Sequence, residues 1–182
     1  MKAASNALSL AARHPVNLAL VRALTDLARE EIEHFQRVLG FLEARGLPLG
    51  SPMVDTYAAD LRKACGALPR KDAVPPIVDR LLVSALIEAR SCERFKLLTV
   101  ALSPERDPEL HAFYTELFAA EARHYQVLVD LAIDAADGDG PRVLARLALL
   151  SEREGEIVRA LALPPSRVPG SPQKNGRAAI HG

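Results

Sequence analysis

Two copies of a Glu-x-x-His pattern lie in the middle of two long segments whose apolar residues recur with the spacing of an α-helix. The first copy pairs Glu31 with His34, and the second pairs Glu121 with His124. Residues three apart lie on one face of a helix, so each copy directs a carboxylate and an imidazole to the same place. The apolar residues on these two faces are Leu24, Leu27, Phe35, Val38 and Leu42, and Leu117, Leu128 and Leu131. The pattern predicts that both polar pairs face a helical core.

Polar groups in such a core need partners. Burying carboxylates and imidazoles among leucines without a partner costs on the order of several kcal/mol. A metal ion turns the same groups into satisfied ligands, and a mixed set of oxygen and nitrogen donors suits iron. The two motifs therefore predict an iron site inside a helical bundle.

A third helical segment supplies another inward carboxylate, Glu88. Its neighbours on the same face are Leu81, Ser84, Ala85, Cys92 and Phe95. Glu93 is the rival acid, but five residues rotate it about 140° around the helix from Glu88. Two-iron bundles use one Glu from each of two helices and Glu-x-x-His from each of the other two. Three of these four elements are present.

The fourth element, a carboxylate on the first helix, is missing. Glu88 precedes Glu121 by 33 residues, and the same spacing before Glu31 falls just before residue 1. No Asp or Glu occurs between Met1 and Thr25. The sequence therefore predicts a site that lacks one carboxylate.

Prolines and glycines divide the chain into helical segments. Aromatic residues make up only 4% of the chain and tryptophan is absent, while alanine and leucine dominate, which favours helices over strands. The predicted helices cover residues 2–13, 16–45, 52–67, 77–102, 108–136 and 142–163. We predict an all-α, ferritin-like four-helix bundle with a helical crossover and an extra C-terminal helix, all within 1–163. Residues 164–182, rich in Pro, Gly, Ser and basic residues, are expected to form a mobile tail.

Charge and cysteine content exclude several classes of protein. The formal net charge is zero, so no global basic field marks a nucleic-acid binder, and such a partner would need local patches. Cys65 and Cys92 are far apart and form no C-x-x-C motif, which argues against a disulfide scaffold or a thiolate zinc site. No signal-peptide pattern or membrane-length apolar run is present, so we expect a cytoplasmic protein.

Three segments carry a family resemblance: Leu27–Phe35, Ile87–Phe95 and Glu121–Tyr125. They resemble the tRNA 2-methylthio-N6-isopentenyladenosine hydroxylases, and the resemblance extends over about residues 2–163. Members of that family use a nonheme di-iron centre, dioxygen and two electrons to hydroxylate the isopentenyl group of adenosine 37, beside the tRNA anticodon. The resemblance implies tRNA as partner, dioxygen as co-substrate, and an external electron donor such as a reductase or ferredoxin.

The resemblance also implies roles for residues of this chain. The iron ligands would be Glu31, His34, Glu88, Glu121 and His124, with Glu31 and Glu121 clamping the two irons. Further candidates are Phe35, Cys92, Phe95 and Leu117 for a dry prenyl pocket, and Arg62, Lys63, Arg70, Lys71, Lys174 and Arg177 for phosphate contacts. The other histidines, His14, His111 and His181, and the acids Glu30, Glu33, Glu43 and Glu116 are expected to be solvated.

Two other functions share the ligand pattern. A ferritin-like iron-storage or peroxide-handling protein would need neither a prenyl pocket nor an RNA surface. An inactive, truncated relative lacking the helix-one glutamate would bind no stoichiometric iron. The long crossover and the extra C-terminal helix argue against the first, and metal analysis would separate the second.

Overall fold

The computed structural model describes residues 2–50, 56–69 and 74–161. Every regular element in these residues is a helix, which confirms the all-α prediction. The helices are α1 (Lys2–Arg13), α2 (Leu18–Ala44), α3 (Tyr57–Gly66), α4 (Pro76–Ala101), α5 (Pro108–Asp134) and α6 (Gly140–Leu161).

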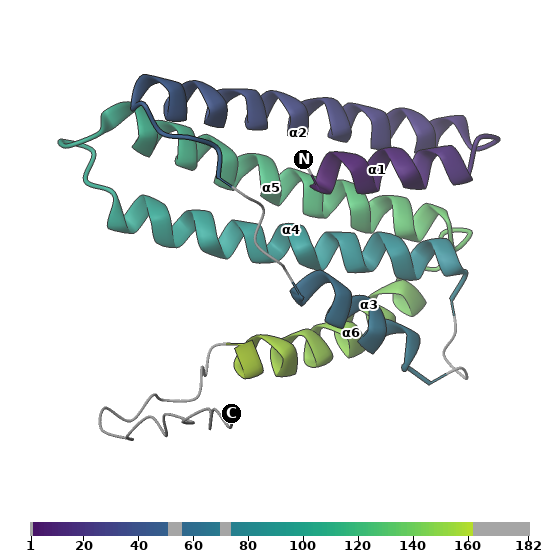
Figure 1. The fold of residues 1–182 in the computed structure, drawn as a ribbon. Helices are drawn as coiled ribbons and strands as arrows, with labels where there is room; N and C mark the ends of the chain where they lie inside the picture. Colours follow the sequence, from purple (N-terminus) through teal and green to yellow (C-terminus); the bar gives the residue numbers. More distant parts are fainter. Residues whose placement is uncertain (1, 51–55, 70–73, 162–182) are drawn as a thin grey trace, which may run out of the picture.

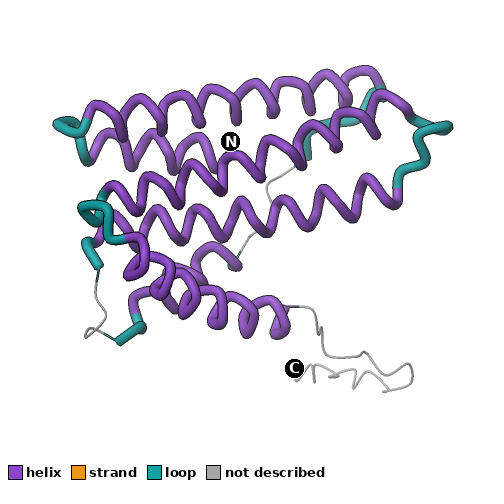
Figure 2. Tube along the Cα trace, turned by 180° about the vertical axis from the view of Figure 1, so that it is seen from behind, coloured by secondary structure: helices purple, strands orange, loops and turns teal. Residues whose placement is uncertain are grey.

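The helices are arranged in pairs. Helix α1 packs against α2, α4 packs along α5, and α2 is in contact with α5. Helices α3 and α6 contact each other and α4, and they cover the side of the α4–α5 pair that faces away from α1 and α2 (Figure 1). The view from behind shows the same order of layers (Figure 2). The predicted crossover helix therefore joins with the extra C-terminal helix to form an outer layer.

Local signals fix the helix termini close to their predicted positions. Asn17 caps α2, because its Oδ1 accepts a hydrogen bond from the backbone N–H of Leu20 at 3.0 Å, so this helix begins two residues later than predicted. Asp107 caps α5 in the same way through the N–H of Leu110 at 3.1 Å. Gly46, with φ of +63°, follows the end of α2, where a left-handed residue is common. The crossover helix was predicted to start at residue 52, but α3 begins at Tyr57, and residues 52–55 lie outside the described residues.

Helix α4 forms the centre of the molecule. It contacts α5 on one side and the α3–α6 layer on the other, so residues on several of its faces are buried. The buried residues of α4 are Val78, Leu81, Leu82, Val83, Ser84, Ala85, Leu86 and Glu88. Despite this apolar content, the described helices include none with the length and hydropathy needed to cross a membrane.

Candidate metal centre

Four metal-ligating side chains from three helices converge inside the bundle. Glu31 comes from α2, Glu88 from α4, and Glu121 and His124 from α5. One ligand atom from each lies within 4.8 Å of the others. Glu88, Glu121 and His124 are buried, and Glu31 is nearly so. Both Glu-x-x-His motifs thus face the core, as their placement in apolar stripes predicted.

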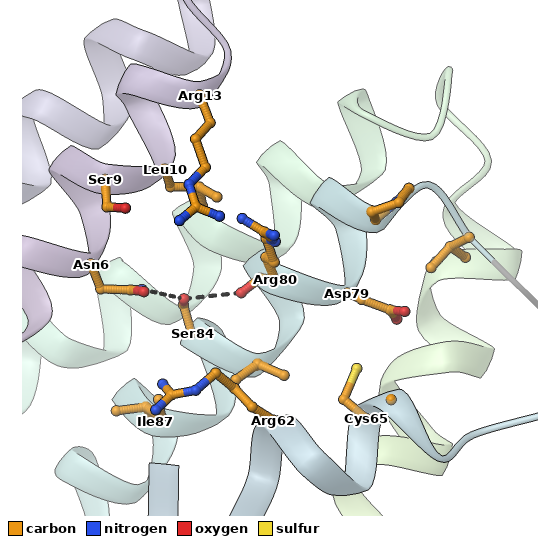
Figure 3. A pocket seen from close by; sticks show the side chains of 14 residues that line it. Asn6, Ser9, Leu10, Arg13, Arg62, Cys65, Asp79, Arg80, Ser84 and Ile87 are labelled. Atoms are coloured by element: carbon orange, nitrogen blue, oxygen red, sulfur yellow. Dashed lines mark hydrogen bonds between the residues drawn. The ribbon is translucent and has the colours of Figure 1, made fainter. Parts of the chain in front are cut away.

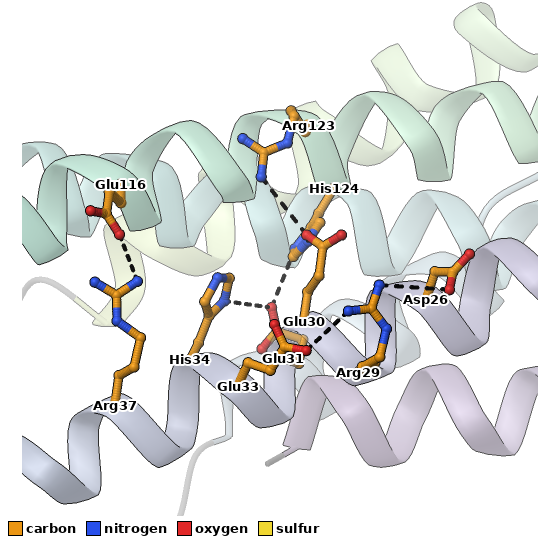
Figure 4. A network of polar contacts seen from close by, with 10 residues as sticks. All are labelled: Asp26, Arg29, Glu30, Glu31, Glu33, His34, Arg37, Glu116, Arg123 and His124. Atoms are coloured by element: carbon orange, nitrogen blue, oxygen red, sulfur yellow. Dashed lines mark hydrogen bonds and ion pairs between the residues drawn. The ribbon is translucent and has the colours of Figure 1, made fainter.

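His34 completes the first motif at the edge of this cluster. Its Nδ1 lies 3.9 Å from Oε1 of Glu31, and its ring centroid lies 6.1 Å from that of His124. Figure 4 shows the imidazoles of His34 and His124 both directed at the Glu31 carboxylate. All five residues that we predicted as ligands therefore lie in one place.

The two candidate acids of α4, Glu88 and Glu93, lie on different faces of the helix, as helical geometry predicted. Glu88 is 5% exposed and joins the cluster. The Glu93 side chain is 64% exposed and pairs instead with Arg90 on the surface. The angular separation of the two residues accounts for this difference.

Several buried atoms of the cluster have no hydrogen-bond partner among the described residues. They are Oε1 of Glu31, Nδ1 of His34, Oε2 of Glu121 and Nδ1 of His124. Nδ1 of His124 and Oε1 of Glu31 lie 3.2 Å apart, but not in hydrogen-bonding geometry. Buried polar groups are almost always satisfied, and a set of unsatisfied carboxylate and imidazole atoms that face one another is what a cation would satisfy. The residues present therefore fit iron.

Electrostatics separates the carboxylates of the cluster into two kinds. Burial alone would raise the pKa of Glu31, but the His124 and His34 imidazoles outweigh it and lower that pKa to about 2. Burial raises the pKa of Glu88 to about 10, helped by the neighbouring Glu121 and Glu31 carboxylates. Burial also raises the pKa of Glu121. Without a cation, three carboxylates so close together cannot all ionise, because their charges repel.

Glu30 is a site residue that the sequence reasoning missed. We expected its side chain to be solvated, but its Oε2 lies 3.1 Å from Nε2 of His124 (Figure 4). Burial would lower the pKa of His124, yet the Glu31 and Glu30 carboxylates raise it. The only sequence signal was the position of Glu30 next to Glu31, which rotates it about 100° away from the motif face. Contact with α5 brings it back into the site.

Helix α1 presents apolar residues rather than a carboxylate to the cluster. Ala3, Ala7 and Leu10 line a small cavity together with Glu88. No Asp or Glu occurs in α1. Within the described residues, α1 therefore contributes no carboxylate to the cluster.

The cavity beside the cluster has different walls from those that we predicted for a prenyl pocket. Leu24, Leu27 and Leu128 line it. Of the predicted lining residues, Phe95 packs on Tyr114 with ring centroids 5.6 Å apart, and Cys92 contacts the carbonyl of Phe118. These two residues pack between α4 and α5.

The remaining predictions concern residues away from the cluster. His14 and His111 are not part of it, and Glu33, Glu43 and Glu116 are exposed as expected. The predicted phosphate contacts Arg70, Lys71, Lys174 and Arg177, as well as His181 and the 164–182 tail, lie outside the described residues.

A helical bundle with two inward Glu-x-x-His motifs and a third buried glutamate is characteristic of the ferritin-like class of carboxylate proteins that bind two metal ions. A solved structure described as protein 43 with aldehyde deformylating oxygenase activity from Synechococcus supports this class: its TM-score is 0.73 at 36% identity, covering 86% of this chain and 73% of that one. The family model of tRNA-(MS2IO6A)-hydroxylase (MiaE) matches residues 1–166. The chain belongs to this family.

Two curated relatives carry the name tRNA 2-(methylsulfanyl)-N(6)-isopentenyladenosine(37) hydroxylase. The protein from Pseudomonas putida is 41% identical over 159 residues, which are 87% of this chain and 73% of the relative. The protein from Salmonella typhimurium is 34% identical over 144 residues, which are 79% of this chain. The chain spans 49%, about half, of the length of the Salmonella relative.

Proposed function

We propose that this chain hydroxylates the isopentenyl side chain of 2-methylthio-N6-isopentenyladenosine at position 37 of tRNA, using dioxygen. The observation that carries the proposal is the convergence of Glu31, Glu88, Glu121 and His124 from three helices, with unsatisfied ligand atoms. Membership of the hydroxylase family supplies the substrate class.

In this proposal, Glu31, His34, Glu88, Glu121 and His124 hold two iron ions. The irons supply activation of dioxygen, which no protein side chain provides. Glu30 accepts a hydrogen bond from Nε2 of His124 and leaves Nδ1 with a lone pair directed into the cluster. Glu88 and Glu121 share protons while no cation is present and release them when one binds.

The surroundings of the cluster suit a reaction that must exclude water. Leu24, Leu27 and Leu128 are buried beside Glu88 and would contact an apolar prenyl group. Two electrons must come from outside the chain, from a reductase or ferredoxin as external donor. Because the substrate is tRNA, we infer that the protein works in the cytoplasm.

Nucleoside mass spectrometry of tRNA tests the proposal. A strain lacking the gene is expected to accumulate prenylated but unhydroxylated adenosine, and the hydroxylated nucleoside is expected to return when the gene is restored. A Glu121→Ala version should fail to restore it, whereas a Glu116→Ala version, changed at an exposed position of the same helix, should succeed. Identical nucleosides with and without the gene would contradict the proposal.

A second version tests the missing carboxylate. A chain extended upstream by a helix that carries glutamate should restore the hydroxyl better than this chain. If neither version binds iron stoichiometrically and chelators leave their stability unchanged, the protein is an inactive relative. Mineralised iron cores in a large shell would instead indicate iron storage.

A further inference from the structure

A cavity of about 530 Å3 lies between α1, α3 and α4 (Figure 3). Three arginines line it, one from each helix: Arg13, Arg62 and Arg80. Pockets that bind small ligands typically have volumes of roughly 300–1,000 Å3. This space, which we call the arginine cavity, therefore has the size of a nucleotide site.

The positive charge of the arginine cavity is not neutralised by the described residues. None of the three guanidinium groups forms an ion pair with a described carboxylate. Asp79 also lines the cavity, but both of its oxygens accept hydrogen bonds from Arg146, at 2.8 and 2.9 Å. Because this two-point pair satisfies Asp79, the three lining arginines are left without a compensating charge.

The orientation of the arginines favours an anion between them. Figure 3 shows the guanidinium groups of Arg13 and Arg80 directed toward one another, with Arg62 on the opposite wall. Like charges that face one another repel, and a phosphate bound between them turns this repulsion into attraction. Guanidinium groups also match the geometry of phosphate oxygens with two parallel hydrogen bonds.

The arginine cavity adjoins the metal cluster. Asn6, Leu10 and Ser84 line both this cavity and the small cavity of about 10 Å3 that Glu88 lines. Nδ2 of Asn6 donates a hydrogen bond to Oγ of Ser84 at 2.9 Å, at the junction of the two cavities (Figure 3). A space of about 10 Å3 holds about one water molecule, so this small cavity would have to widen before a prenyl group could pass from the arginine cavity toward Glu88. Opening it would join a cationic cavity to an apolar route that ends at Glu88.

We propose that the arginine cavity binds a backbone phosphate of the RNA substrate through Arg13, Arg62 and Arg80, next to the entrance of the route to Glu88. This inference rests on the proposed function and deepens it, because it says where the RNA is held. It explains why a chain with zero net charge can bind RNA: the positive charge is concentrated in one cavity beside the reaction site.

RNA binding tests this proposal without any need for turnover. The probe is a fluorescent anticodon stem-loop RNA, measured by anisotropy with the iron-loaded chain over a series of salt concentrations. The variants are Arg13→Gln, Arg62→Gln and Arg80→Gln, all at exposed positions, so folding should be preserved. The matched control is Arg94→Gln, which removes the same charge from an exposed position of α4, about 21 Å along the helix from Arg80.

Each of the three variants is expected to weaken RNA binding by about tenfold, the value of one charge-assisted hydrogen bond. Each should also lower the slope of log affinity against log salt by about 0.7–0.9, as the loss of one phosphate contact requires. Arg94→Gln should change neither. Equal effects of all four variants, or no effect of the three, would overturn the proposal.

Two further experiments are needed. One distinguishes a small anion from an RNA phosphate as the ligand, and the other distinguishes failure of the phosphate site from failure of the proposed function. If AMP or inorganic phosphate binds in an arginine-dependent way while RNA affinity is the same in the wild type and the arginine variants, the cavity binds a small anion and the RNA assignment is wrong.

A stem-loop with unmodified adenosine has the same phosphates, so its binding should show the same dependence on the arginines. Arginine-dependent binding without hydroxylation of the prenylated stem-loop would refute only the proposed function. Hydroxylation by a wild-type chain whose arginine variants bind normally would refute only the phosphate site.

Discussion

Nε2 of His124 lies 3.1 Å from Oε2 of Glu30, while Nδ1 of the same ring lies 3.2 Å from Oε1 of Glu31. One imidazole on α5 is therefore held between two consecutive carboxylates of α2. A hydrogen bond donated by Nε2 selects the tautomer whose Nδ1 has a free lone pair, which is the form that binds a metal. We therefore expect Glu30 to position the His124 ring for metal binding.

Replacing Glu30 with alanine should weaken iron binding by about 10–100-fold, because the ring loses the partner that fixes its tautomer and orientation. Glu30→Gln keeps an acceptor oxygen and should lose less. Competition with a colorimetric chelator measures the affinity. Glu33→Ala, which changes an exposed carboxylate on the same helix, is the control and should behave like the wild type. If Glu33→Ala lost as much iron affinity as Glu30→Ala, the affinity would depend only on the total charge of α2 and not on the contact with His124.

Iron should stabilise the folded chain, because the ligand set is assembled only when α2, α4 and α5 pack together. At a free iron concentration about 100 times the dissociation constant, the gain is about 2.7 kcal/mol. For a domain of this size, this corresponds to a rise of about 5–10 °C in the midpoint of thermal unfolding. The rise should disappear in His124→Ala and persist in His111→Gln, which changes a histidine of α5 outside the cluster. An equal rise in both variants would place the iron elsewhere.

The metal-free chain should become less stable as the pH rises from about 6 to 9. The pKa of Glu88 is about 10 in the folded chain against an ordinary value of 4.5, so between these values folding requires proton uptake. The free energy of unfolding then falls by up to about 1.4 kcal/mol per pH unit. The raised pKa of His124 acts in the same direction. The stability that protonated His124 contributes is fully present below the ordinary pKa of histidine and is lost as the pH rises through the raised pKa.

Glu31, with its pKa lowered to about 2, affects stability only in acid. The stability that its carboxylate contributes is lost as the pH falls from about 4.5 to 2.

Urea unfolding at several pH values measures this dependence. Glu88→Gln should flatten it and make the metal-free chain more stable than the wild type at pH 9, because the variant buries no ionisable group there. Glu93→Gln removes an exposed carboxylate from the same helix and should keep the wild-type slope. A slope that is unchanged in Glu88→Gln would mean that Glu88 titrates normally.

The outer layer should depend on a single carboxylate oxygen. Oε1 of Glu154 on α6 accepts hydrogen bonds from the Tyr57 hydroxyl at 3.0 Å and from Nε and Nη2 of Arg90 at 2.9 and 2.6 Å. Glu154→Ala leaves both donors without this acceptor in a largely buried place and should cost about 3 kcal/mol of unfolding free energy. Glu156→Ala breaks an exposed pair with Arg153 and should cost less than about 1 kcal/mol. Equal losses in chemical denaturation would contradict this account.

The sequence by itself determined the helices and the two motifs. Helix boundaries depend on local features, such as a proline in the first turn or the capping side chain of Asp107. They could therefore be read within one or two residues, apart from the start of the crossover helix, which was predicted at 52 whereas α3 begins at Tyr57. The inward direction of Glu31 and Glu121 followed from their apolar neighbours on the same face. The angular position of Glu88 relative to Glu93 followed from helical periodicity alone. These relationships lie within single helices, whose geometry is the same in every fold.

Only the tertiary structure decided which side chains meet between helices. The pairing of Glu30 with His124 depends on which turn of α2 lies opposite which turn of α5, and a shift by one turn would separate them by about 5.4 Å. The arginine cavity requires α1, α3 and α4 to come together, so Arg62 could be named as a phosphate contact from the sequence whereas Arg13 and Arg80 could not. Such contacts join residues far apart in the chain, 94 positions for Glu30 and His124, and no local pattern in the chain encodes their proximity.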